Sequence, residues 1–295
     1  MLYAGLASGQ LLLPPSLHDI PLTTIMGDFH TSNFGFLIED GSQSNSVIFS
    51  PNDFDDACIG HAGWDLLRFC SSLVLCAKHC RGLAGLYHST EVHMDKPVVS
   101  DSQVNEAING FLSAYLSTCE VGIQNKIHFA MAVSRINSPA RLRKRYLKAQ
   151  QRSTSSVLFE SKSALAKSTD INLNGLIFKV NPEKFVVLSS ELKKQLTDVF
   201  EPYMDDAVLD VVERVNAGIG SVNMQRYYFL IGPKDFQVKI DLPLCHIVEV
   251  KQQREAAPIH YFSDLSPVNR LNPAHLKVVC QTRMQRAPDL MLNEV

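Results

Sequence analysis

Apolar residues recur with a helical period over much of the first two thirds of the chain. Those at positions 66, 69, 70, 73 and 77 follow a 3.6-residue repeat and predict an amphipathic helix directly after Asp65. A second stripe, over residues 104–115, follows a cap formed by Ser100 or Asp101. Helical periodicity continues over residues 120–168. These patterns predict a mostly helical region.

Short apolar runs rich in β-branched and aromatic residues predict strands. Residues 36–38 and 47–49 flank a polar turn and predict a hairpin near the N-terminus. Residues 176–178 and 185–188 predict a second hairpin around a proline turn. From Val208 onward β-like runs dominate, and strands are expected at 211–215, 225–231, 236–240 and 246–251.

The change from helical to strand periodicity gives the best domain boundary. A helix capped by Ser189 or Ser190 is expected to end near Met204. We therefore expect an α+β protein with two lobes. One is mostly helical and covers residues 1–205, and the other is β-rich and covers residues 206–295.

The amino-acid composition and net charge limit the classes of protein to which the chain can belong. The chain has 295 residues, of which 45% are hydrophobic, so it can bury a sizeable core. The formal net charge of −2 gives no reason to expect nucleic acid or a membrane surface as a partner. No signal-peptide pattern and no apolar run of about 20 residues is found. The 7 cysteines contain no C-x-x-C pair, which is typical of reduced thiols in a cytoplasmic protein.

Two polar segments near the N-terminus carry the strongest chemical signal. Residues 26–35 place Asp28 and an asparagine five positions apart after an apolar run, and residues 51–57 bring further carboxylates. A carboxylate that can take a hydroxyl proton, an asparagine carbonyl and other carboxylates form the oxygen-rich site that Mg²⁺ and a triphosphate require. We therefore predict Asp28 as the catalytic residue and three metal ligands, Asn33, Asp53 and Asp55. A solvated acidic turn is the alternative for residues 53–56.

A second constellation lies in the β-rich region. Gly218, Gly220 and Ser221 form a glycine-rich turn between two predicted strands, where backbone amides could approach phosphate oxygens. An ordinary hairpin turn is the alternative. Lys251, with Lys239 as the second choice, follows on a later strand, as does the lysine that holds nucleotide phosphates in kinases.

The parts of a kinase site are thus present in reversed chain order. The catalytic and metal-binding segments come first, and the glycine-rich turn and lysine come last. A circular permutation would preserve the geometry, because termini and loops tolerate such rewiring. We therefore expect a permuted, kinase-like arrangement of the two lobes, with Mg²⁺ and ATP as cofactors.

Two further features leave alternatives open. Asp65 either caps the helix that follows it, or caps it and also supports the catalytic loop by hydrogen bonds. Basic residues form a stripe on a helix expected after Pro139: Arg141, Arg143, Lys144, Arg145 and Lys148. This stripe is either a solvated helix face or a docking site for an acidic or phosphorylated substrate.

The chain resembles a bacterial uncharacterised family known as domain of unknown function 2252. The matching segments run in family order over nearly the whole chain: residues 27–35, 52–56, 64–66, 218–221, 226–228 and 278–285. The N-terminal segments also resemble the aminoglycoside and choline phosphotransferases. That likeness implies a catalytic role for Asp28 and metal binding by Asn33 and Asp53. We also expect His30, Asp65 and Arg226 to give structural support to the site.

The sequence departs from these patterns at several places. Met26 stands where the phosphotransferases have histidine, and Asn223 stands where a glycine is expected in the phosphate loop. Family members also continue past the segment 278–285, so the chain is expected to be a fragment or a diverged member.

Three function classes follow from these observations. The leading one is a phosphotransferase that uses Mg²⁺ and ATP on an unidentified hydroxyl of a small molecule or a protein. The second is a nucleotide-binding module without catalysis. The third is a metal-dependent phosphoesterase, in which His30 and His61 would join the carboxylates as ligands of two metals.

Overall fold

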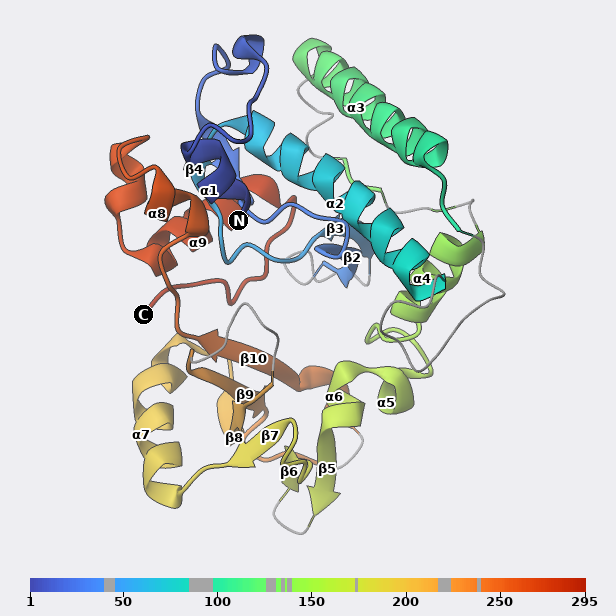
Figure 1. Ribbon diagram of the computed structural model, residues 1–295. Coiled ribbons are helices and arrows are strands. Elements are labelled where there is room, and N and C mark those ends of the chain that lie inside the picture. Colours follow the sequence, from blue (N-terminus) through green and yellow to red (C-terminus); the bar gives the residue numbers. More distant parts are fainter. Residues whose placement is uncertain are drawn as a thin grey trace. The chain divides into compact units, whose positions relative to one another are not determined.

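The computed structural model (Figure 1) describes residues 1–39, 46–84, 98–125, 131–133, 136, 140–172, 175–216, 224–237 and 240–295. These residues contain helices and several small antiparallel sheets, so the expected α+β class is confirmed. No helix among them is both long and apolar enough to cross a membrane. The kinase-like, permuted arrangement stays a prediction.

The chain forms two compact units, each assembled from separate segments. The first unit combines residues 1–35, 49–133 and 255–286, and the second combines residues 36–48, 134–254 and 287–295. The boundary expected near residue 205 lies inside the second unit, because strands on either side of that position belong to one sheet.

A small sheet lies in the first unit. β1 (Thr23–Ile25) pairs antiparallel with β4 (Cys58–Gly60). Buried Ile25, Met26 and Trp64 belong to a core shared with residues from both ends of the chain. The surrounding elements are α1 (Leu2–Ala7), η1 (Pro15–Leu17), α8 (Ala257–Tyr261), η7 (Pro267–Arg270) and α9 (Pro273–Met284).

Two long helices complete the first unit: α2 (Ala62–Ala84) and α3 (Asp101–Gln124). Ser100 caps α3 as expected, through a capping box with Gln103. The expected start of α2 is wrong. The helix begins four residues earlier than expected, so Asp65 lies in its first turn and is not its N-cap. The carboxylate of Asp65 is instead bound by backbone N–H groups outside the helix.

The expected N-terminal hairpin is confirmed. β2 (Phe34–Ile38) pairs with β3 (Val47–Pro51). The rings of Phe34 and Phe49 stack with their centroids 5.9 Å apart. This pairing brings the ends of both polar segments together, since the N–H of Asn52 donates to the carbonyl of Asn33 at 3.2 Å.

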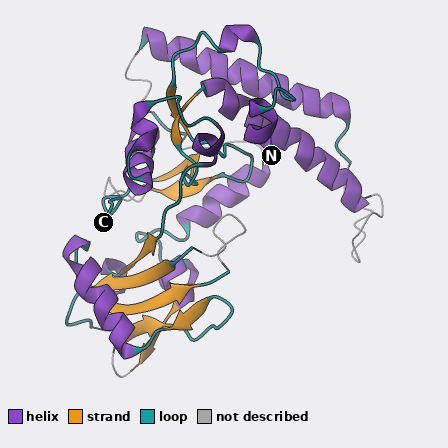
Figure 2. Ribbon diagram, turned by 60° about the vertical axis from the view of Figure 1, so that its left-hand side comes forward, coloured by secondary structure: helices purple, strands orange, loops and turns teal. Residues whose placement is uncertain are grey.

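A four-stranded antiparallel sheet forms the centre of the second unit, in the order β10-β9-β8-β7. One face packs on α7 (Ser190–Phe200), whose expected cap Ser189 is confirmed. Phe229 and Ile231 point to this face and Leu230 to the other, as the alternation of a strand requires. Figure 2 shows α7 beside the sheet. The strands are β7 (Phe185–Val187), β8 (Ala207–Arg214), β9 (Arg226–Gly232) and β10 (His246–Lys251).

Helices and a second hairpin pack on the opposite face. Buried Phe159, Leu165 and Phe178 contact Leu230 in one apolar cluster. The elements on this face are α5 (Phe159–Lys162), α6 (Ala164–Ser168), β5 (Thr169–Asn172), β6 (Gly175–Phe178) and η6 (Leu242–Leu244). The second unit also contains α4 (Ala140–Gln150) and η4 (Glu201–Tyr203), which directly follows α7.

Two strand expectations in this unit are wrong. Residues 176–178 pair with β5, and residues 185–187 pair with β8, so these two runs do not form a hairpin together. Only two residues separate β5 from β6, which favours the local pairing. The strand expected over 236–240 is absent at the residues described there. Instead, the Asp241 carboxylate accepts from the Gln237 N–H at 2.6 Å.

Candidate functional site

The loop that follows β1 begins with a glycine that no other residue can replace without strain. Gly27 has a φ of +73°. A Cβ at this position would lie 2.0 Å from the carbonyl oxygen of Asp56. The close approach of the two backbones therefore packs the Asp28 loop directly against the 51–57 segment.

Asp65 fixes the backbone of this loop. Its carboxylate accepts hydrogen bonds from the N–H of Met26 at 2.8 Å and from the N–H of Gly27 at 3.1 Å. The hydroxyl of Tyr3 donates to the carbonyl of Gly27 from the other side. Burial raises the pKa of Asp65 to about 6, although the two N–H donors lower it. The expected loop support by Asp65 is therefore present, without the cap.

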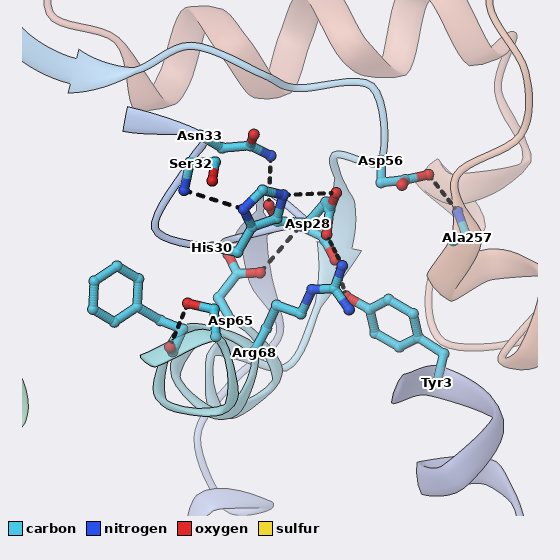
Figure 3. Close-up of polar contacts among 12 residues, drawn as sticks. Tyr3, Asp28, His30, Ser32, Asn33, Asp56, Asp65, Arg68 and Ala257 are labelled. Atoms are coloured by element: carbon cyan, nitrogen blue, oxygen red, sulfur yellow. Dashed lines mark hydrogen bonds and ion pairs between the residues drawn. The ribbon is translucent and has the colours of Figure 1, made fainter. Parts of the chain in front are cut away.

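The carboxylate of Asp28 lies between two side chains (Figure 3). The Arg68 guanidinium of α2 forms an ion pair with one oxygen, and Nε2 of His30 lies 3.4 Å from the other. Nδ1 of His30 accepts from the N–H of Ser32 at 3.2 Å, so in the neutral ring the proton is on Nε2 and faces Asp28. The Asp28 side chain is 30% exposed, so it remains accessible to solvent.

Asn33 is buried and joins the two polar segments. Its side-chain amide nitrogen donates to the backbone carbonyl of Asp28 at 2.8 Å, and its own backbone carbonyl accepts from the N–H of Asn52. The amide nitrogen is thus engaged on the Asp28 side, which leaves the amide oxygen as the group that could bind a cation. Asn33 and Asp28 are brought together as the sequence predicts.

The predicted metal ligands Asp53 and Asp55 lie on the adjoining segment. Oδ1 of Asp53 accepts from the N–H of Asp55 at 3.2 Å, which closes a short turn between them. Asp56 faces the C-terminal part of the unit and accepts from the N–H of Ala257 at 2.9 Å. The oxygen donors of Asn33 and Asp53 fit a hard cation such as Mg²⁺ by their chemistry. Among the residues that the structure describes, no three His, Cys, Asp or Glu side chains form a group that could hold a metal.

Several residues of the site are not indicated by the motifs of the two polar segments. Arg68 lies one helical turn after Asp65, and this i, i+3 spacing on a predicted helix could have identified it. The hydroxyl of Ser72, a further turn along α2, accepts from the N–H of Thr31 at 3.2 Å. Tyr3 comes from a distant segment, and no local pattern indicates its contact with Gly27.

Residues near the C-terminus hold the second polar segment in place. Buried Lys277 of α9 donates to the carbonyl of Ala57 at 3.2 Å, and burial lowers the pKa of its ammonium. Asn269 exchanges two hydrogen bonds with the backbone of Ile59, at 2.8 and 2.9 Å. The segment that contains Asp53 and Asp56 is therefore held in place by hydrogen bonds with residues more than two hundred positions away in sequence.

The predicted nucleotide-binding residues belong to the other unit. Gly218, Gly220, Ser221 and Lys239 lie outside the described residues. Lys251 ends β10 and lies directly opposite Arg226 of β9, so two cations form a cross-strand pair. Arg226 is held by an ion pair with Glu249 at 3.0 Å.

The comparisons with known proteins identify a family and nothing finer. No curated protein matches the chain, and no solved structure matches it either. A family model described as "Uncharacterized protein conserved in bacteria (DUF2252)" matches residues 2–295. Because the match covers nearly the whole chain, this protein belongs to the DUF2252 family.

Proposed function

We propose that the protein is a phosphotransferase that uses Mg²⁺ and ATP to phosphorylate a hydroxyl group. The observation that carries the proposal is the joining of two polar loops in one small region of the first unit, with Asp28 on one loop and Asp53 on the other. Phosphoryl transfer depends mostly on positioning and charge stabilisation, so a rigid pair of loops suits it.

Asp28 would bind and orient the acceptor hydroxyl. Its carboxylate is partly exposed. The backbone of its loop is fixed by hydrogen bonds with the carboxylate of Asp65 and with the hydroxyl of Tyr3. An entering hydroxyl would compete with His30 for one carboxylate oxygen, because the 3.4 Å contact between Nε2 of His30 and that oxygen is long. The other oxygen would stay paired with Arg68.

The oxygen of the Asn33 side chain and the carboxylate of Asp53 would hold Mg²⁺, with Asp55 as a third donor. When bound, the ion would supply charge neutralisation for the transferred phosphoryl group. Asn33 is suited to this role because its amide nitrogen already donates to the Asp28 backbone, which fixes the direction of its oxygen.

The phosphates of ATP are assigned to the glycine-rich turn and to Lys251, with Lys239 as the second choice. The support for Lys251 is electrostatic. Its direct cross-strand neighbour is Arg226, so two cationic side chains start from the same end of the β9–β10 pair. Arg226 is already anchored by Glu249, so it would act as a fixed neighbour of the phosphate-binding lysine.

One observation favours the second candidate, a nucleotide-binding module without catalysis. The ion pair with Arg68 occupies an oxygen of Asp28 that a catalytic base would use. The phosphoesterase hypothesis gains no such support. His61 contacts His18 and Trp64 rather than Asp28, and the described residues contain no cluster of three metal-ligating side chains.

Thermal unfolding with and without Mg²⁺ and ATP tests the proposal. A ligand that binds only the folded state raises the free energy of unfolding by roughly 2.7 kcal/mol at a hundredfold excess over its dissociation constant. We expect a Mg²⁺-dependent rise in Tm that Asp53→Ala abolishes. Asp19→Ala is the matched control, because it removes an exposed carboxylate from the same unit.

Asp28→Asn separates the two candidates. A phosphotransferase should keep the nucleotide-dependent rise in Tm in this variant and lose turnover of ATP with an acceptor, whereas a binding module shows no turnover in either protein. A folded protein whose Tm does not change with Mg²⁺ and ATP would refute both nucleotide-based candidates.

A further inference from the structure

The helix α4 carries an unusual distribution of charge. Residues 140–152 contain 6 arginines and lysines and no aspartate or glutamate, although the chain as a whole has a formal net charge of −2. The five cations inside the helix are all exposed: Arg141, Arg143, Lys144, Arg145 and Lys148. None of them pairs with a carboxylate within the part of the chain that the structure describes.

Four of these cations form one stripe on the helix surface. Arg141, Lys144, Arg145 and Lys148 follow the i, i+3, i+4, i+7 spacing that places side chains on a single face. The stripe is about 10 Å long, from the rise of 1.5 Å per residue. A different face is buried, where Ala149 is covered and Tyr146 packs on Phe36 with ring centroids 5.7 Å apart. The stripe, which we call the α4 basic face, therefore does not contribute to the core.

The same charges oppose the stability of the helix that carries them. Like charges three or four residues apart destabilise a helix by about 0.2–0.5 kcal/mol per pair, and the α4 basic face contains several such pairs. Arg141 and Arg143 also lie in the first turn, where the helix dipole favours anions, and no acidic residue is present there. Lys148 in the last turn is the one favourably placed. An external anion would relieve these repulsions.

We propose that the α4 basic face is a docking site for an acidic segment of a partner protein. The short length of the stripe and its charge match a few carboxylates on an extended peptide, which rises about 3.3 Å per residue. Longer polyanions fit less well. The residues outside α4 carry a net negative charge that would repel a nucleic acid strand or an anionic membrane extending beyond the helix.

The proposal is tested by fluorescence anisotropy with a labelled peptide of about 12 residues in which Glu and Ser alternate. A peptide of this length is long enough to span the stripe. The same peptide with Gln in place of Glu is the neutral probe. We expect binding of the Glu peptide at low salt, with affinity that falls about tenfold or more as salt is raised towards 0.5 M, because exposed charges are screened. The Gln peptide should not bind.

Two matched double variants assign the binding to the helix. In Arg141→Glu with Arg145→Glu, we expect at least about tenfold weaker binding of the Glu peptide, since two attractive charges become repulsive. The control is Lys194→Glu with Lys234→Glu, which makes the same change in net charge at exposed positions of the same unit and should leave binding within about twofold.

Stability measurements distinguish lost docking from lost folding. Arg141→Glu places an acidic residue in the first turn, and both substitutions create opposite-charge pairs with Lys144 and Lys148, so the Tm should be unchanged or higher. The proposal is overturned if the Glu peptide fails to bind, if both double variants bind it equally, or if the α4 variant loses binding together with its fold. Tighter binding of single-stranded RNA or phosphatidylserine vesicles than of the peptide would also overturn it. The outcome does not depend on nucleotide binding.

Discussion

At the residue scale, some contacts of the Asp28 loop can be predicted from the sequence and others cannot. The spacing of Asp28 and Asn33 is readable, and the structure brings these residues together. Arg68 and Tyr3 also contact the loop, but neither belongs to a recognisable motif. An arginine on an amphipathic helix is ordinary, and a tyrosine in an apolar N-terminal segment resembles any core residue. Their partners are set by packing between distant segments, which local patterns do not encode.

Replacing Gly27 should strongly destabilise the protein. Gly27→Ala introduces a side chain at a positive φ and within 2.0 Å of the Asp56 carbonyl oxygen, so we expect the free energy of unfolding to fall by about 2–4 kcal/mol. Gly110→Ala is the control. Gly110 lies within α3 with no heavy atom in the way of a Cβ, and the change should stabilise that helix by up to about 1 kcal/mol. Urea denaturation measures both, and equal effects would contradict this account of Gly27.

Asp65 should make stability depend on pH in the mildly acidic range. Its pKa is raised to about 6 in the folded protein, against about 3.9 in an unfolded chain. Between these values the folded state binds more protons, so the Asp65 contribution is fully present below about pH 4 and is lost as pH rises through about 6. The loss is on the order of 3 kcal/mol.

The measurement for Asp65 is the difference in free energy of unfolding between the wild type and Asp65→Asn, taken at a series of pH values. We expect this difference to decline from pH 4 to pH 6, because the asparagine does not titrate. A difference that is flat or rises over this range would show that another group carries the dependence.

At the element scale, helices followed local signals more closely than strands did. The Ser100 cap and the Ser189 cap both act as their sequences indicate, since a capping hydroxyl contacts a residue only three positions away. Strand partners are not local. Phe185 of β7 pairs with Arg214 of β8 across the whole of α7, whereas its sequence neighbours favoured a hairpin with residues 176–178. In the structure, residues 185–187 pair with β8 in the four-stranded sheet and not with residues 176–178.

Removing the Ser100 cap should weaken α3. The hydroxyl of Ser100 accepts from the N–H of Gln103 at 3.2 Å, so Ser100→Ala should lower the free energy of unfolding by about 1 kcal/mol. Ser102→Ala, two residues further on, removes only a 3.5 Å contact with Glu106 and should cost less than about 0.5 kcal/mol. Guanidinium denaturation of both variants compares them, and a larger effect at Ser102 would refute the assignment of the cap.

At the scale of the whole molecule, the expected α+β class is confirmed, and the lobe boundary near residue 205 lies inside one unit. The boundary was placed where helical periodicity ends. Periodicity reports local structure, however, whereas a unit is defined by which segments pack together. Residues 255–286 follow the last strand of the second unit, yet their buried Leu276 and Cys280 belong to the core around Trp64. No pattern in the sequence marks that change of partner.

A fragment containing residues 206–295 should therefore not fold alone. It lacks β7 and α7, so Phe229 would lose its contact with Phe200, and residues 255–286 would lose the rest of their unit. Circular dichroism of the fragment during heating should show no cooperative transition, while the full chain should show one. A sharp transition in the fragment would establish residues 206–295 as an independent domain.

The first unit is assembled from segments that lie far apart in the sequence, and this has a consequence for its folding during synthesis on the ribosome. Tyr3, Ile25 and Trp64 are synthesised first, but the core around them is completed by Leu276 and Cys280, which follow more than two hundred residues later. At about 5–20 residues per second, the early segments wait for roughly 10–40 s with apolar side chains exposed. Residues 255–286 do not belong to the second unit, so the folding of that unit is not delayed until they have been synthesised. Nascent chains of this protein should consequently rely on chaperones for the half of the molecule that contains Asp28.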